Sequence, residues 1–299
     1  MKRKIDSTNT NISSSSSSSN LLKSLTKTAS DSTSSLSKLS SKLMMKDDDT
    51  ITPELFKAFN EKTIDFIIHF TQKLNLVSDR IVIATATTYL HRFFELQSMK
   101  QHDRFVIGLA CVFLACKVEE QPRHIKDIIS HYFNFRFNSK HPGSELYLQM
   151  MDSLVAAERI LLQTLSFDLE VIHPYTHLMT QLRSIKGYIP KERLKEFTDT
   201  SRSFINDSFV TKLCLKYSPQ YISASCMLLA SQQIHLDLIP PGKSKTNNSD
   251  DYENWQELII NELDIDWSSL NEICNNILDI YEDGYGKYIP KEDKNDIKK

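Results

Sequence analysis

The stretch FVIGLACVFLAC, from Phe105 to Cys116, decides the fold, because it contains no charged or strongly polar side chain. A helix that is apolar on every face must be surrounded by other helices. At this length the stretch is also too short to cross a bilayer as a helix. We therefore expect the central helix of a helical bundle, and an all-α protein around it.

A lysine follows this stretch at the point where the helix should end. Lys117 lies four residues after Phe113 and three after Leu114, so it continues an inward-facing stripe. A cation in the last turn also complements the helix dipole. We expect Lys117 to be held against the edge of the core.

A carboxylate further along the chain is equally out of place. In LVAAERILLQTL, Leu154, Glu158, Leu161 and Leu165 follow the i, i+4, i+7, i+11 spacing of one helix face, which puts Glu158 on an apolar stripe. Burying it unpaired would cost several kcal/mol. Lys117 is the obvious partner. Spacing alone leaves two interpretations open: an internal ion pair that fixes helix register, or a site that binds a partner protein.

These segments carry a resemblance to a known family. RFVIGLACVFLACKVEEQPRHIKDII (104–129) followed by ERILLQTLSFDLEVIHPY (158–175) resembles the first cyclin box of the transcription-type cyclins, with the K type most similar, ahead of types T, L and C. The likeness continues in YLHRFF (89–94), INDSF (205–209) and LNEICNNILDIY (270–281). Several spaced motifs are far more specific together than any one alone.

The resemblance implies two tandem cyclin boxes, each a five-helix repeat, and a cyclin-dependent kinase as the partner in a heterodimer. In the family, the matching lysine and glutamate contact the kinase, which carries over to Lys117 and Glu158. The surrounding residues of the implied kinase-binding set are Val118, Glu120, Leu162, Phe167 and Leu169. The implied kinase phosphorylates the C-terminal domain of RNA polymerase II during elongation, so the chain should be a nuclear regulatory subunit and not an enzyme.

Composition divides the chain into four predicted parts. Residues 1–48 form a serine-rich tail that cannot support a packed core and should be disordered. Residues 49–172 form the first cyclin box, which binds the kinase, and residues 173–284 form the second. Residues 285–299 are a flexible tail.

Helical spacing and capping residues predict the elements. The first box should contain a helix that starts at Thr52-Pro53-Glu54, a helix over Asp79–Leu96, the central helix from Arg104, one after Pro122, and the one that carries Glu158. In the second box we expect a connector over His173–Ser184 and a new helix from Pro190. A polar loop over Pro240–Asp250 and a last helix over Leu270–Tyr281 complete it.

An internal repeat links the two boxes. A shift of 115 residues superposes Phe113–Lys117 on Leu228–Gln232, and Cys111 on Cys226. The lysine position holds Gln232 in the second copy, so only the first box should bind the kinase through such a pair.

Charge and cysteine usage limit the function classes. Residues 1–46 hold eight lysines or arginines and two aspartates, a balance of +6, which leaves −8 for the rest of a chain whose net charge is −2. A part that acidic is a poor general nucleic-acid binder, so no direct nucleic-acid contact and no membrane are expected. The five cysteines include no CxxC pair and indicate buried thiols in a reducing compartment.

Metal binding, catalysis and two other functions are each supported by fewer residues than the cyclin resemblance. His173 and His177 lack a third metal ligand nearby, and His91-Arg92 has no nucleophile motif beside it, so we expect no catalytic residue, no cofactor and no metal. One alternative is a DNA-associated general transcription factor with cyclin-type repeats, but zinc-ribbon CxxC pairs are missing. Another is a helical scaffold without a kinase, favoured if Lys117 and Glu158 satisfy only each other.

Overall fold

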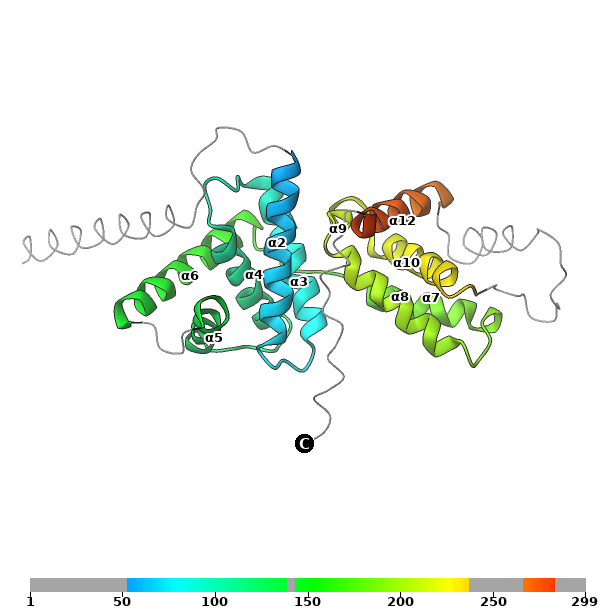
Figure 1. The fold of residues 1–299 in the computed structure, drawn as a ribbon, viewed down its shortest axis with the longest axis horizontal. Helices are drawn as coiled ribbons and strands as arrows, with labels where there is room; N and C mark the ends of the chain where they lie inside the picture. Colours follow the sequence, from blue (N-terminus) through cyan, green and yellow to red (C-terminus); the bar gives the residue numbers. More distant parts are fainter. Residues whose placement is uncertain (1–52, 139–142, 237–265, 283–299) are drawn as a thin grey trace, which may run out of the picture. The chain divides into compact units, whose positions relative to one another are not determined.

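The computed structural model describes residues 53–138, 143–236 and 266–282, and every regular element in these ranges is helical. The first group of helices is α2 (Pro53–Gln72), α3 (Asp79–Leu96), α4 (Arg104–Val118), α5 (Ile125–Phe137) and α6 (Ser144–Thr164). The second is α7 (Pro174–Ile185), the short 3-10 helix η1 (Lys186–Tyr188), α8 (Leu194–Ser208), α9 (Leu213–Lys216), α10 (Pro219–Gln233) and α12 (Trp267–Glu282), as Figure 1 shows. The prediction of an all-α fold is confirmed.

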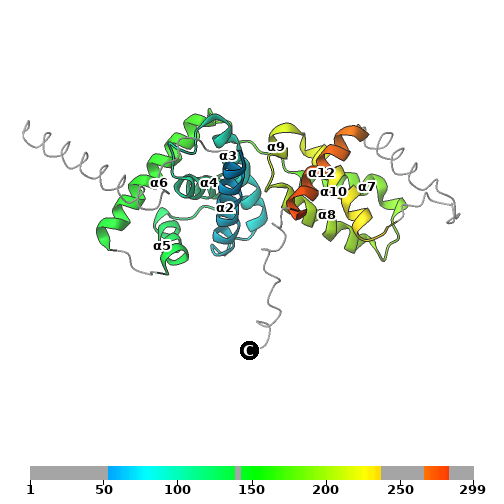
Figure 2. The ribbon, with the colours of Figure 1, turned by 45° about the horizontal axis from the view of Figure 1, so that its top comes forward.

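Helix α4 is the core of the first bundle. Every residue from Ile107 to Cys116 is buried, and the helix packs against α2, α3 and α6, among which it lies in Figures 1 and 2. Its start is fixed by Asp103, whose carboxylate accepts hydrogen bonds from the backbone N–H groups of Phe105 and Val106. The apolar stretch that opened the sequence analysis is therefore the central helix that it predicts.

Helix α10 has the same place in the second bundle. All residues from Ile222 to Ser231 are buried, and α10 packs against α7, α8 and α12. Both of its ends lie 115 residues after the corresponding ends of α4, and α8 begins 115 residues after α3 begins. The internal repeat is therefore a repeat of structure.

The two central helices also end in the same way. Each closes with two backbone hydrogen bonds that satisfy carbonyl groups of the last turn, and the donor of one of them has a positive φ, 54° at Glu120 and 49° at His235. The bonds run from Gln121 to Cys116 and from Glu120 to Lys117 in the first bundle, and from Leu236 to Ser231 and from His235 to Gln232 in the second.

The predicted connector over His173–Ser184 is wrong, because Pro174–Ile185 forms the helix α7. Pro174 occupies its first turn, where a missing N–H costs nothing. Leu178, Leu182 and Ile185 follow helical spacing and are buried in the core of the second bundle. The prolines and polar residues around this segment obscured a regular amphipathic pattern.

Three other boundaries differ from prediction. Helix α8 begins at Leu194 and not at Pro190, because Pro190 starts a turn in which its carbonyl accepts the Arg193 N–H at 3.0 Å. The short helix α9 had no predicted counterpart. The last helix is longer than expected and starts at Trp267.

Several predicted features lie outside the described residues: the tail 1–48, the N-cap at Thr52, the loop over Pro240–Asp250 and the tail 285–299. The box boundaries at 49–172 and 173–284 also stay predictions. Within the described ranges, no helix combines the length and the hydropathy that a bilayer crossing requires.

Candidate functional site

Lys117 and Glu158 meet across the first bundle. Lys117 lies in the last turn of α4 and Glu158 in the middle of α6, two helices that pack along each other. The Lys117 ammonium donates to both carboxylate oxygens of Glu158, with Nζ–Oε1 at 2.7 Å and Nζ–Oε2 at 2.9 Å. The sequence-based pairing of these two residues is therefore what the free chain adopts.

The pair lies at the surface. The Lys117 side chain is 42% exposed and that of Glu158 is 14% exposed. The ammonium also lies 4.0 Å from the centre of the Phe113 ring, a distance at which a cation is attracted to an aromatic face. Lys117 thus rests on the core edge as expected, while one face of the ammonium stays open to water or to a partner.

The end of α4 that carries Lys117 is tied to the loop between α2 and α3. The Gln121 side chain pairs with the backbone of Ser78 in both directions, at 3.1 and 3.4 Å. The Arg123 guanidinium donates to the carbonyl groups of Leu74 and Asn75. Glu120, in the same segment, is exposed. These bonds fix the direction in which the last turn of α4 presents Lys117.

The predicted apolar residues of the kinase-binding set differ in their exposure. Val118 and Leu162 are half-buried, and Leu162 lies one turn after Glu158 on α6. Phe167 is 68% exposed and sits in a left-handed turn, with φ of 60° after 53° at Ser166. Left-handed backbone is costly for a residue with a side chain, and so is the exposure of a large apolar ring to water. Phe167 carries both of these unfavourable free-energy terms.

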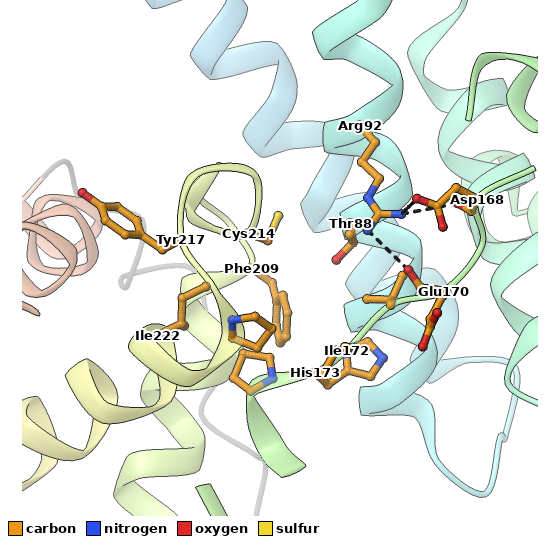
Figure 3. A pocket seen from close by; sticks show the side chains of 13 residues that line it. Thr88, Arg92, Asp168, Glu170, Ile172, His173, Phe209, Cys214, Tyr217 and Ile222 are labelled. Atoms are coloured by element: carbon orange, nitrogen blue, oxygen red, sulfur yellow. Dashed lines mark hydrogen bonds and ion pairs between the residues drawn. The ribbon is translucent and has the colours of Figure 1, made fainter. Parts of the chain in front are cut away.

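Leu169 is also half-buried, and the segment around it is held by α3. The Tyr89 hydroxyl donates to the Leu169 carbonyl at 2.7 Å. The Arg92 guanidinium donates to the carbonyl groups of Asp168 and Glu170, each at 3.3 Å, as Figure 3 shows. The YLHRFF motif thus positions the segment that follows α6, and burial, followed by the negative charge of Glu119, raises the pKa of Tyr89.

Sequence reasoning missed two exposed apolar residues on α6. Leu148 is 53% exposed and Val155 is 52% exposed. With Met151, Glu158 and Leu162 they follow the i, i+3, i+7, i+10, i+14 spacing of one helix face. The heptad spacing was visible in the sequence, but the sequence did not show that Leu148 and Val155 would be left exposed by the described residues.

The rival chemistries find little support in the geometry. His173 Nε2 is hydrogen-bonded to Thr85 Oγ1, at 2.9 Å. In the described ranges, no group of three potential ligands could hold a metal ion. An open cavity of about 310 Å³, shown in Figure 3, is lined by Arg92, His173, Cys214 and their neighbours. Burial raises the pKa of the Cys214 thiol to about 11, so this thiol is not an activated nucleophile. All five cysteines are free, and four are buried.

Comparison with known proteins gives the family. The model named "Cyclin, N-terminal domain" matches residues 31–170. Cyclin-K of Danio rerio is 33% identical over 219 residues, which cover 73% of this chain and 48% of that protein. Cyclin-T1-5 of Arabidopsis thaliana is 33% identical over 216 residues, 70% of this chain and 34% of that protein. The chain belongs to the cyclin family.

This cyclin spans between about a third and a half of the length of such relatives, among them Cyclin-K of Homo sapiens, of which it matches 36%. The similarity to types K and T confirms the predicted transcription-type cyclin. Of solved structures, a viral cyclin from herpesvirus saimiri matches with a TM-score of 0.54 and 14% identity, over 78% of this chain and 88% of that one. A chain of the yeast RNA Pol II CTD kinase CTDK-1 complex matches with a TM-score of 0.58 and 16% identity, over 79% of this chain and 72% of that one.

Both structural matches show the fold of this cyclin. The tandem repeat, the buried α4 and the buried α10 are therefore features of two cyclin boxes. The assignment of Lys117, Glu158 and their neighbours to kinase binding is not tested by these comparisons and stays a prediction.

Proposed function

We propose that this cyclin is a regulatory subunit that binds and activates a cyclin-dependent kinase, one that phosphorylates the C-terminal domain of RNA polymerase II during elongation. The observation that carries the proposal is the Lys117–Glu158 pair, whose lysine side chain is 42% exposed, together with the exposed apolar residues Val155 and Phe167 before and after Glu158 in the chain. The kinase class is supported by the similarity to cyclins K and T and by the fold shared with a chain of the CTDK-1 complex.

The geometry suits recognition of a helix end on the kinase. Among the described residues, the Lys117 ammonium donates to Glu158 as its one hydrogen-bonding partner, and an ammonium has three N–H donors. It can therefore donate to a backbone carbonyl of the kinase, while the Glu158 carboxylate accepts from a backbone N–H. The exposed stripe of α6 and the Phe167 ring would exclude water around these bonds.

Activation follows from which kinase state such a surface binds. A protein kinase is active when a glutamate on its αC helix pairs with the ATP-site lysine. If the cyclin surface binds the kinase with that helix swung inward, the binding free energy shifts the kinase toward the active population. The kinase then carries out the phosphoryl transfer with its own residues, and the cyclin only holds the αC helix of the kinase in its active position.

The internal pairing of Lys117 and Glu158 is also what the scaffold alternative requires. Two observations weigh against a purely structural pair. The Lys117 side chain is 42% exposed, and a pair that serves the core alone has no reason to stand beside large apolar side chains in solvent. The second bundle folds around α10 with Gln232 at the lysine position, so the fold does not need the charge.

The decisive experiment uses affinity purification from the native cell, followed by a kinase assay on a peptide of the polymerase C-terminal domain. Wild type is compared with Lys117→Ala, Glu158→Ala and the matched control Gln232→Ala, which alters the equivalent end of α10. We expect the first two variants to lose at least about tenfold in kinase recovery, because truncating one member of such a pair costs about 2 kcal/mol or more. The control should behave as wild type.

Equal kinase recovery by all four proteins, each folded by circular dichroism, would make Lys117 and Glu158 a structural pair and favour the scaffold. A band shift of duplex DNA by the purified protein at physiological salt would favour the DNA-associated alternative. Because the proposed substrate is nuclear, we also propose a nuclear location. Imaging of the tagged protein in the native cell tests it, and exclusion of the tagged protein from the nucleus would contradict it.

A further inference from the structure

A second charged side chain at the end of α4, that of Glu119, bonds to α3 and not to α6. Glu119 is the C-cap residue of α4, two positions after Lys117, and its N–H bonds the Ala115 carbonyl at 2.9 Å. Its carboxylate accepts a hydrogen bond from the Thr85 hydroxyl of α3 at 2.5 Å. The same oxygen lies 3.7 Å from Nε2 of His173, the N-cap residue of α7. Three separate segments of the chain meet at this carboxylate.

The protons in this cluster can be assigned. The Thr85 hydroxyl has one hydrogen, which it donates to Glu119. The contact between Thr85 Oγ1 and His173 Nε2, at 2.9 Å, must then be a hydrogen bond from the imidazole to the hydroxyl. This fixes the Nε2–H tautomer of a neutral His173 and leaves its Nδ1 buried without a hydrogen-bond partner. Burial lowers the pKa of His173, which keeps the ring neutral, although Glu119 opposes that effect.

The side chains of this cluster are largely buried, so their hydrogen bonds are protected from competition with water. Thr85 is fully buried, the His173 side chain is 11% exposed, and that of Glu119 is 22% exposed. Hydrogen bonds to a charged group are stronger than neutral ones, and an unsatisfied carboxylate at this depth is costly. Because Glu119 also closes the last turn of α4, a change in its side-chain bonds would loosen the turn that holds Lys117.

The internal repeat gives a comparison within the same chain. At the shift of 115 residues, Thr85 corresponds to Thr200, Lys117 to Gln232 and Glu119 to Ile234. Ile234 packs against the core of the second bundle, so that end of a central helix closes without a carboxylate. The acidic cluster therefore accompanies the lysine and is not a general requirement for ending such a helix.

We propose that Glu119, Thr85 and His173 form a positioning network that ties the last turn of α4, which carries Lys117, to the N-terminus of α7, the first helix of the second bundle. The proposal rests on the proposed kinase-binding function. It gives the second bundle a part in kinase activation, because α7 supplies His173 even though α10 carries no lysine at the equivalent position.

The first test needs no kinase. Hydrogen exchange of the Glu119, Glu120 and Gln121 amides, which close the helix by bonds to Ala115, Lys117 and Cys116, is compared in Thr85→Val and Thr87→Val. Thr87 is the matched control, since it is equally buried on α3 and bonds only its own helix through the Ile83 and Ala84 carbonyls. We expect faster exchange at these amides in Thr85→Val alone. Equal exchange in the two variants overturns the network.

The second test measures the dissociation constant for the kinase recovered with wild type. Thr85→Val should weaken binding by about tenfold, the size expected for one lost bond to a charged group. In a Lys117→Ala background the same change should have no further effect, because the network acts through Lys117. An equal loss in both backgrounds would show a general structural role and overturn the proposal. If wild type binds no kinase, the proposed function fails, while the exchange experiment still decides the network.

Should Thr85→Val fail to fold, Glu119→Gln replaces it in both measurements. The amide oxygen still accepts from Thr85 but the charge is gone, so we expect the same pattern with a smaller loss. Glu119→Gln with wild-type exchange and wild-type affinity would also overturn the proposal.

Discussion

His91 of α3 and Phe209, the C-cap residue of α8, are joined by a hydrogen bond in which the imidazole Nε2 lies 2.9 Å from the Phe209 carbonyl oxygen. The carbonyl can only accept, so Nε2 carries the proton. Nδ1 of the same ring is buried without a hydrogen-bond partner. A neutral ring satisfies this arrangement, while a protonated one would bury an unpaired N–H and a charge.

This bond predicts a stability change at mildly acid pH. Burial lowers the pKa of His91 to about 4, and the Phe209 carbonyl and the nearby Glu95 oppose that effect only in part. The unfolded value is about 6.5. Between these two values the unfolded chain binds more protons than the folded one, so the free energy of unfolding should decrease as pH falls from about 6.5 to about 4, by about 3 kcal/mol.

Urea unfolding at several pH values checks this prediction. His91→Gln keeps an N–H donor near the Nε2 position and removes the titration, so its stability should depend less on pH than that of wild type. His173, whose pKa is also lowered by burial, leaves a residual slope in both proteins. Parallel pH profiles for wild type and His91→Gln would contradict the prediction.

Phe167 predicts that stability and kinase binding can change in opposite directions. Its backbone is left-handed, with φ of 60°, and its ring is 68% exposed. Phe167→Gly removes the strain and little buried surface, so the free energy of unfolding should stay equal to wild type or rise by up to about 1 kcal/mol. Kinase affinity should nevertheless fall, because the ring belongs to the proposed binding surface.

Two controls separate these effects. Phe167→Ala keeps the left-handed strain and should be less stable than Phe167→Gly by about 1 kcal/mol, with the same loss of affinity. Leu96→Ala removes another apolar side chain, 69% exposed at the end of α3, and should bind the kinase as wild type does. Unchanged affinity in Phe167→Gly would remove Phe167 from the binding surface.

The sequence predicted what depends on local spacing. The apolar stretch before Lys117 predicted the central helix, and the stripe that carries Glu158 gave the ion pair with Lys117 as one of two interpretations. It could not predict the Glu119 network, because neither Thr85 nor His173 is a charged residue that stands out on an apolar stripe as Lys117 and Glu158 do. The exposure of Leu148 and Val155 on α6 was also missed, because burial depends on which helices pack against a given face, and spacing within one helix does not give that.

Gly108 and Ser223 occupy equivalent positions in the two central helices, and substitutions at them should change stability in opposite directions. A Cβ on Gly108 would lie 3.2 Å from Thr63 Cγ2 and 3.5 Å from Phe66 Cδ1, so α2 approaches α4 closely. Gly108→Val should lower the free energy of unfolding by about 1–3 kcal/mol through overpacking.

At Ser223 the side chain carries a hydroxyl that lowers the stability of the fold. Its hydroxyl is buried without a hydrogen-bond partner. Ser223→Ala removes that unsatisfied group and should raise the free energy of unfolding by about 1 kcal/mol. Thermal or urea unfolding of both variants checks the pair of predictions. A destabilised Ser223→Ala would show that the hydroxyl is satisfied in solution.

The Lys117–Glu158 pair predicts an asymmetric effect on stability. After Glu158→Ala, the Lys117 side chain, already 42% exposed, can be hydrated, so the cost should be below about 1 kcal/mol. After Lys117→Ala, the Glu158 side chain, 14% exposed, loses the cation that contacts both of its oxygens. Lys117→Ala should therefore be the more destabilising change of the two.

A double-mutant cycle in urea tests this asymmetry. The double variant Lys117→Ala/Glu158→Ala should be no less stable than Lys117→Ala, because the stranded carboxylate is gone. The same four proteins, measured for kinase affinity, should show a loss in every variant, since both charges belong to the proposed binding surface. If the double variant unfolds more easily than either single one, the two side chains stabilise the fold independently. The ion pair would then not be the unit on which the proposed surface depends.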